Sequence, residues 1–75
     1  MQAEEFLNLL KAVPFRPFSL HLTEGKTMEI THPDQALVSR ESAVIGLNPD
    51  ERGFVHGWAI CYFPHVVRIE RVSTL

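Results

Sequence analysis

The side chains best suited to metal or acid–base chemistry are the four histidines, His21, His32, His56 and His65. They are spaced too widely for the HxH or HxxxH pairs of local metal sites. Ser39 and Ser42 lack the G-x-S-x-G context of an activated nucleophile, and no Gly-rich phosphate loop occurs. We therefore predict no metal ligands, no cofactor and no catalytic residues, and we do not expect an enzyme.

Two polar positions have a structural interpretation. His32-Pro33-Asp34 is predicted to turn the chain, with the Asp34 carboxylate accepting a hydrogen bond from a backbone N–H two residues on. A ligand role for His32 is the alternative. A solvated polar face is the favoured interpretation of His21 and Glu29 on the outward side of the first hairpin, and a cross-strand contact between them is the alternative.

The most informative stretch is 58–63, which is apolar without alternation, as expected where both faces of a strand are covered. One face would fill the core, so Trp58, Ile60 and Tyr62 would form an apolar stripe outside it. The helix, a long loop or a neighbouring subunit must cover this stripe. We expect the subunit, and predict an oligomer interface made of Trp58, Ile60, Tyr62, Val66 and Arg68.

An N-terminal helix and several short strands must position these residues. Helical spacing of apolar residues predicts a helix over about 3–13, with Phe6, Leu10 and Val13 in its buried stripe and Pro14 ending it. Alternation and turn residues predict antiparallel strands between about 17 and 72, among them 18–23, 27–31 and 43–47, with a Gly25 turn and an exposed loop at 48–53. The last two strands are expected at 54–63 and 65–72.

Short strands at this spacing, preceded by one helix, predict a mainly β fold. The expected architecture is a small, bent, antiparallel SH3/Sm-like barrel of about five strands, with the helix capping an open end.

Length and composition set the remaining limits. The 75 residues allow one domain, 1–75, and the net charge of −2 disfavours a broadly basic nucleic-acid binder. Cys61 is the single cysteine, which excludes an internal disulfide and favours the cytoplasm. No apolar run approaches the roughly 18 residues of a membrane span, so no membrane partner is expected.

The string Phe15-Arg16-Pro17-Phe18, followed by His21-Leu22, Glu24-Gly25 and His32-Pro33-Asp34, resembles a family of short bacterial proteins of unknown function. Members of that family share an FRPF, HL, DG and HP(D/E) pattern over nearly the whole chain. The resemblance implies a family but no activity.

A more distant similarity is to the Sm-like proteins, including the bacterial RNA chaperone Hfq. Phe63-Pro64-His65-Val66-Val67 is similar to the Tyr-Lys-His-Ala-Ile segment that borders the RNA-binding pore of that family. Only His65 keeps its residue type, and Pro64 replaces the Lys, which weakens an RNA interpretation because cations supply most nucleic-acid affinity. Pairing of the fourth strand with the fifth strand of the next subunit, as in Sm rings, is what the resemblance implies for assembly.

We therefore expect a non-enzymatic interaction or assembly module that self-associates through its C-terminal strand pair, with a further protein partner as a possibility. The alternative is an Sm/Hfq-like ring that binds RNA through His32, His65, Arg68 and Arg71. A third hypothesis is a small-ligand site in the barrel mouth near His32 and Trp58.

Overall fold

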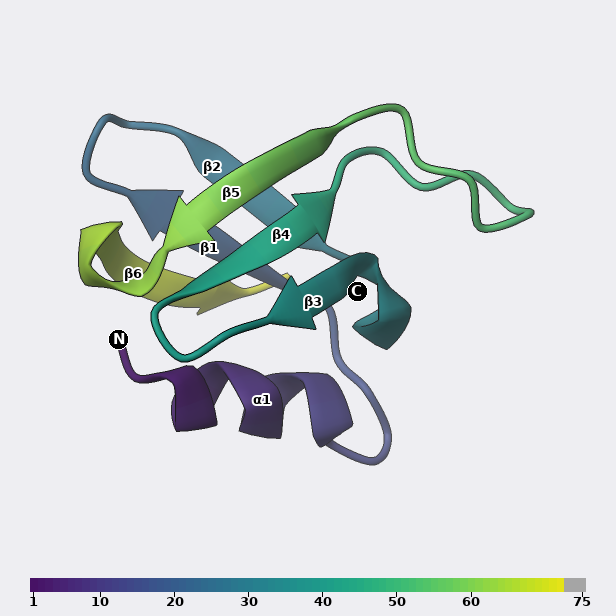
Figure 1. Cartoon of the computed structure of the whole chain (residues 1–75). Coiled ribbons are helices and arrows are strands. Elements are labelled where there is room, and N and C mark those ends of the chain that lie inside the picture. Colours follow the sequence, from purple (N-terminus) through teal and green to yellow (C-terminus); the bar gives the residue numbers. More distant parts are fainter. Residues whose placement is uncertain (73–75) are drawn as a thin grey trace.

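The computed structural model describes residues 1–72, which form one helix, six strands and two short 3₁₀ turns (Figure 1). Residues 73–75 of the predicted domain lie outside the described residues. In chain order the elements are α1 (Ala3–Lys11), β1 (Phe18–Leu22), β2 (Thr27–Ile30), the 3₁₀ turn η1 (Pro33–Gln35), β3 (Ala36–Val38), β4 (Ser42–Gly46), β5 (Trp58–Tyr62), the 3₁₀ turn η2 (Phe63–His65) and β6 (Val66–Arg71). The prediction of a mainly β chain with an N-terminal helix is confirmed.

The strands form two separate antiparallel sheets of three, in the orders β2-β1-β6 and β3-β4-β5. We call them the first and the second sheet. No strand ladder within residues 1–72 joins them, so they do not close into a hydrogen-bonded barrel. The C-terminal strand pair that was expected as one unit is divided, because β5 pairs with β4 and β6 returns to pair with β1.

Helix α1 is shorter than predicted. Its buried residues are Ala3, Phe6 and Leu10, whereas Val13 lies outside the helix and is 96% exposed. The inclusion of Val13 in the buried stripe is therefore wrong. The reason is local: Pro14 disfavours helical geometry at Val13, and the backbone of Ala12 is already extended (φ −59°, ψ 141°).

The two C-terminal strands also begin later than predicted. Residues 54–57 belong to the β4–β5 loop, where Gly53 (φ 91°) and Gly57 (φ 149°) adopt left-handed conformations that a strand does not allow. The Asp50 carboxylate holds the loop tip by accepting hydrogen bonds from the N–H groups of Arg52 (2.9 Å) and Phe54 (3.0 Å). The 48–53 part of the loop and the Gly25 turn (φ 81°) are as predicted.

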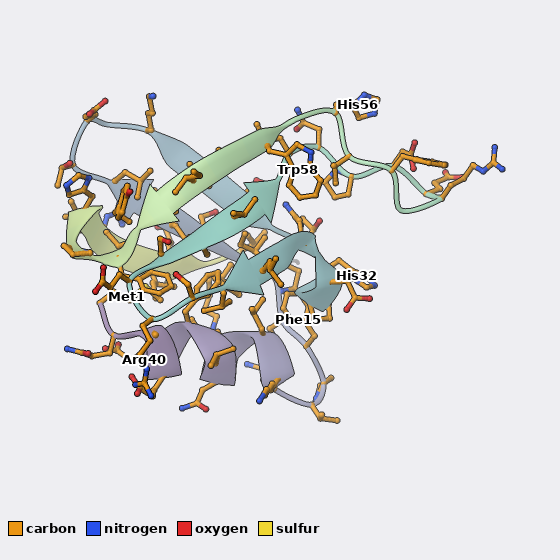
Figure 2. The ribbon with its side chains drawn as sticks, in the orientation of Figure 1. Met1, Phe15, His32, Arg40, His56 and Trp58 are labelled. Atoms are coloured by element: carbon orange, nitrogen blue, oxygen red, sulfur yellow. The ribbon has the colours of Figure 1, made fainter. Side chains whose placement is uncertain are left out.

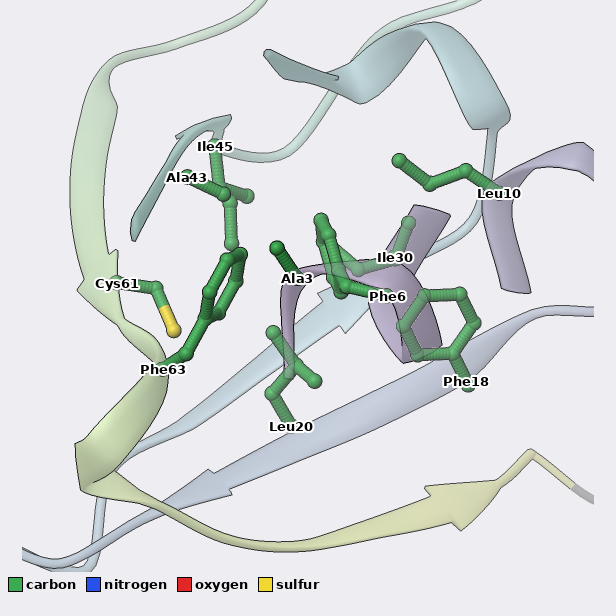
Figure 3. Packing of buried hydrophobic residues seen from close by; sticks show 10 residues of the cluster. All are labelled: Ala3, Phe6, Leu10, Phe18, Leu20, Ile30, Ala43, Ile45, Cys61 and Phe63. Carbon is green, nitrogen blue, oxygen red and sulfur yellow. The ribbon is translucent and has the colours of Figure 1, made fainter. Parts of the chain in front are cut away.

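The core lies between the two sheets and is closed on one side by α1 (Figures 1 and 3). Phe6 of the helix is fully buried and contacts Phe18 and Phe63, with ring centroids 5.8 and 5.5 Å away. Helix burial therefore fastens the first sheet to η2 through aromatic packing. The complete core cluster is Ala3, Phe6, Leu10, Phe18, Leu20, Ile30, Ala43, Ile45, Cys61 and Phe63.

A buried amide also connects the sheets. The Gln35 side chain, 6% exposed, donates to the carbonyls of Glu29 and Gly46, both at 2.8 Å. Its Oε1 accepts from the backbone N–H of Thr31 at 2.9 Å. Because Glu29 belongs to β2 and Gly46 to β4, this one residue fixes the corner at which the chain passes from the first sheet to the second.

Candidate functional site

The outward side of the second sheet carries the most distinctive surface of the molecule. Ala43 and Ile45 of β4 and Cys61 of β5 are in the core, so the alternating residues of these strands point outward. The register aligns them in rows: Leu37 opposite Val44 and Val44 opposite Ile60, with Gly46 opposite Trp58 and Ser42 opposite Tyr62. We call this surface the outer face; it consists of Leu37, Ser42, Val44, Gly46, Trp58, Ile60 and Tyr62.

The outer face is apolar, and its four largest side chains are open to solvent, whereas Ser42 and Val44 are half-buried and Gly46 is buried. Its exposed fractions are 75% for Leu37, 67% for Trp58, 61% for Ile60 and 54% for Tyr62. None of its residues carries a charge at neutral pH. In Figure 1 the second sheet lies in front of the first, and Figure 2 shows the Trp58 side chain on this side of β5. A contiguous apolar patch of this kind on a small domain is typical of a surface that contacts another molecule.

The predicted stripe of Trp58, Ile60 and Tyr62 is thus found on the surface, and α1 and the β4–β5 loop leave it exposed. Val66 and Arg68, the other two predicted interface residues, lie on β6 in the first sheet. Each of β5 and β6 is one of the two edge strands of its own sheet. The five residues therefore belong to two separate edges.

Leu37 and Val44, which extend the outer face across β3 and β4, are not among the residues predicted from the sequence. A signal was present: Ala36-Leu37-Val38 and Ala43-Val44-Ile45 are apolar at three consecutive positions. In a strand such a run must place an apolar side chain on each face. The same reasoning that identified β5 therefore applies to all three strands of the second sheet.

The candidate RNA-binding residues are spread over the molecule. His32 precedes η1 and His65 ends η2, and the two turns lie at opposite ends of the molecule in Figure 1. Arg68 lies 3.5 Å from the Glu70 carboxylate, which offsets its charge. Arg71 is exposed at the end of β6, opposite Phe18 of β1. The four side chains do not form one basic cluster within a single chain.

The outward side of the first sheet is polar, in contrast to the outer face. His21 Nε2 lies 2.9 Å from Glu70 Oε1, and His21 Nδ1 lies 3.3 Å from the Thr27 hydroxyl. The alternative of a His21–Glu29 contact is wrong, because the register places Glu29 opposite Ser19 and Thr27 opposite His21. The His21 hydrogen bond, and then the charge of Arg68, hold the pKa of the Glu70 carboxyl below its ordinary value.

The His32-Pro33-Asp34 turn forms as predicted but with the roles reversed. His32 Nδ1 accepts a hydrogen bond from the Asp34 backbone N–H at 3.1 Å, so the imidazole caps the turn in place of the Asp34 carboxylate. The reason is that Pro33 starts a 3₁₀ helix whose N-cap is His32, and an N-cap side chain accepts from the first free N–H groups.

The third hypothesis is a ligand site near His32 and Trp58, and the structure does not place these two residues in one cleft. A cleft of about 490 Å³ lies between η1 and the β4–β5 loop and is lined by His32, Asp34, Asp50 and Val55 among others, but Trp58 does not line it. Within residues 1–72, no group of three His, Cys, Asp or Glu side chains is placed to hold a metal ion. The lining of the cleft includes one histidine, His32, and three acidic residues, Asp34, Asp50 and Glu51.

Cys61 is 1% exposed, and burial raises the pKa of its thiol. It therefore has the environment of a packing residue, as its apolar sequence context predicts.

No protein-family model, curated protein or solved structure matches the chain. Among the helices of the described part, none has the length and apolar character needed to cross a membrane.

Proposed function

We propose that this chain is a non-enzymatic assembly module that self-associates, with the outer face of the second sheet as its contact surface. The observation that carries the proposal is the uncharged apolar surface formed by Leu37, Val44, Trp58, Ile60 and Tyr62. A contact here would remove the exposed apolar side chains of this surface from water. Burial of apolar area is the main favourable contribution to protein association.

The size of the surface supports a second copy of the chain as the occupant. Four large apolar side chains, two of them aromatic, are more than half exposed on it, which is the kind of group that forms the centre of a standard stable interface of about 800 Å² per partner. The outer face would supply the apolar centre and the neighbouring polar residues the rim. A chain of 75 residues without a disulfide also gains more from added burial than a larger domain does.

We further propose that the chain is a divergent SH3/Sm-like domain, related to the short bacterial proteins that share its FRPF and HPD elements. The strand sequence supports this proposal: β2 leads through the η1 corner into β3, and η2 separates two edge strands. The buried single cysteine supports the cytoplasm as the compartment.

Sedimentation velocity over a concentration series tests the proposed function, with Ile60→Glu as the variant and Val13→Glu as the matched control. Both positions are exposed β-branched residues, at 61% and 96%, but only Ile60 lies on the outer face. Ile60→Glu would place a charge in the contact, so we expect it to weaken self-association at least a hundredfold while Val13→Glu leaves it unchanged. A single 8.5 kDa species of the unmodified chain at high micromolar concentration would contradict the proposal.

The alternative, an RNA-binding ring, makes a different prediction for the same preparation. Native mass spectrometry of protein purified without nuclease would show bound RNA, and RNA binding would fall steeply with salt and with Arg68→Ala. Either result would favour the ring over the proposed assembly module, because the outer face contains no phosphate-binding cation.

A further inference from the structure

The side chains of the outer face differ in size from one strand to the next. The outward positions of β5 are large (Trp58, Ile60 and Tyr62), and we call them the ridge. The outward positions of β4 are smaller (Gly46, Val44 and Ser42), and we call them the trough. Leu37 of β3 bounds the trough on its other side.

Each row of the register pairs one large and one small residue: Trp58 with Gly46, Ile60 with Val44, and Tyr62 with Ser42. At the Gly46 end the trough is already filled from the same chain, because a Cβ on Gly46 would lie only 2.5 Å from Val55 Cγ1. Val44 and Ser42, which are half-buried, form the rest of the trough between the ridge and Leu37.

We propose that two copies pack outer face to outer face about a twofold axis that runs parallel to the strands between β4 and β5. This inference rests on the proposed function and adds its geometry. A half-turn about such an axis places the ridge of each copy over the trough of the other, and it preserves the position of every row along the strands. Ile60 then lies over Val44 of the partner subunit, and Tyr62 lies over Ser42 of the partner subunit.

In the Ile60 and Tyr62 rows the surface is therefore complementary to itself, which is the requirement for an isologous interface, whereas Trp58 faces the filled Gly46 end of the partner subunit's trough. Ridge-into-trough packing also allows the two sheets to approach to the separation of about 10 Å that is usual for face-to-face sheets. A half-turn about an axis across the strands would instead stack ridge on ridge and leave the troughs empty, which close packing disfavours. The interface closes after two copies, so a dimer is expected.

The competing arrangement uses edges in place of faces, with β5 of one copy pairing with β6 of the next. It would form a head-to-tail ring and would involve Val67, which is 63% exposed on β6. The two arrangements thus depend on different residues: the face-to-face dimer needs an open trough at Val44, and the ring needs the exposed edge at Val67.

Three variants separate the arrangements, each measured by sedimentation velocity and native mass spectrometry, with circular dichroism as the check on folding. Val44→Trp fills the trough without adding charge, and we expect it to raise the dimer dissociation constant at least tenfold. Val44→Trp with Ile60→Ala removes the knob that meets the filled trough, and dimerisation should be restored in large part. Val67→Glu should leave the dimer unchanged.

A species larger than two chains that survives Val44→Trp but is lost in Val67→Glu would overturn this geometry while leaving self-association standing. A folded Val44→Trp variant that dimerises as tightly as the unmodified chain would also overturn it. If the unmodified chain is monomeric throughout, the proposed function fails as well. Should Val44→Trp fail to fold, Ser42→Trp fills the open end of the same trough and is read in the same way.

Discussion

At the scale of single residues, Gln35 has the greatest structural role for its size. Its amide satisfies carbonyl groups of two strands, β2 and β4, and the N–H group of Thr31 just after β2, and no side-chain polar atom that is buried within the described residues lacks a partner. A network of this kind stabilises only when every member is satisfied. Deleting one member leaves several buried groups without partners at once.

We therefore predict that Gln35→Ala lowers the free energy of unfolding by about 2 to 4 kcal/mol, because the carbonyls of Glu29 and Gly46 and the N–H of Thr31 would be left unpaired. Urea denaturation monitored by Trp58 fluorescence measures the change. Asn8→Ala, which removes an exposed amide from α1, is the control and should change stability by less than about 0.5 kcal/mol. Equal effects of the two variants would show that the bridge between the sheets contributes nothing.

Individual side-chain partners were the part of this molecule that sequence could predict least. The turn at His32-Pro33-Asp34 follows from local rules, but whether His32 or Asp34 caps it depends on the 3₁₀ geometry that Pro33 starts. His21 meets Glu70 across 49 positions of sequence, and this contact exists only because β6 returns beside β1. No local pattern contains that information.

At the scale of elements, local chemistry predicted most of the fold, and the errors lie where long-range contacts decide. The helix, the Gly25 turn and the β1, β2 and β4 positions follow from periodicity and turn residues. Residues 54–57 have strand-like composition, yet the Asp50-centred loop contains them. The partition into two sheets was also beyond local signals, because the β1–β6 pairing joins residues near opposite ends of the chain. The outer-face stripe of β5 was predictable because side chains point alternately to the two faces of any strand, so an apolar run places apolar side chains on both faces.

The Glu70 contacts across the β1–β6 pair contribute to folding stability in a pH-dependent way. The pKa of Glu70 is lowered in the folded chain by the His21 hydrogen bond and by Arg68, so the folded state releases this proton more readily than the unfolded state, whose ordinary value is 4.5. The stabilisation is therefore complete above pH 4.5 and is lost as the pH falls through the lowered folded-state pKa.

We predict that Glu70→Gln flattens this acid limb of the stability curve. The urea midpoint of the unmodified chain should fall more steeply below pH 4.5 than that of the variant, since the amide neither titrates nor pairs with Arg68 as an ion. Glu29→Gln, on the outward side of the neighbouring strand β2, serves as the control and should keep the unmodified slope. Parallel curves for the Glu70→Gln variant and the unmodified chain would show that the His21, Arg68 and Glu70 contacts do not couple to folding.

At the scale of the whole molecule, the two sheets present outward sides of opposite character. The first sheet shows His21, Thr27, Arg68 and Glu70 in a network of polar contacts. The second shows the uncharged outer face. A chain with one polar and one apolar side gains free energy by burying only the apolar side. Such a chain favours a closed pair of copies over an assembly that adds copies on both sides.

Folding and association should then be linked. If the native state is a dimer and the unfolded state is not, mass action stabilises the native state as protein concentration rises. For a domain of this size, raising the protein concentration from the dissociation constant to a hundred times that value should raise the midpoint of thermal unfolding by roughly 5 to 10 °C. Differential scanning calorimetry at two concentrations measures this shift, and Ile60→Glu should abolish it.

Because the outer face carries no charge, the shift should be nearly the same in 50 mM and 500 mM sodium chloride and should grow in sodium sulfate, which strengthens apolar burial. A midpoint that is independent of concentration in the unmodified chain, or a shift that sodium chloride removes, would contradict an apolar contact between two copies.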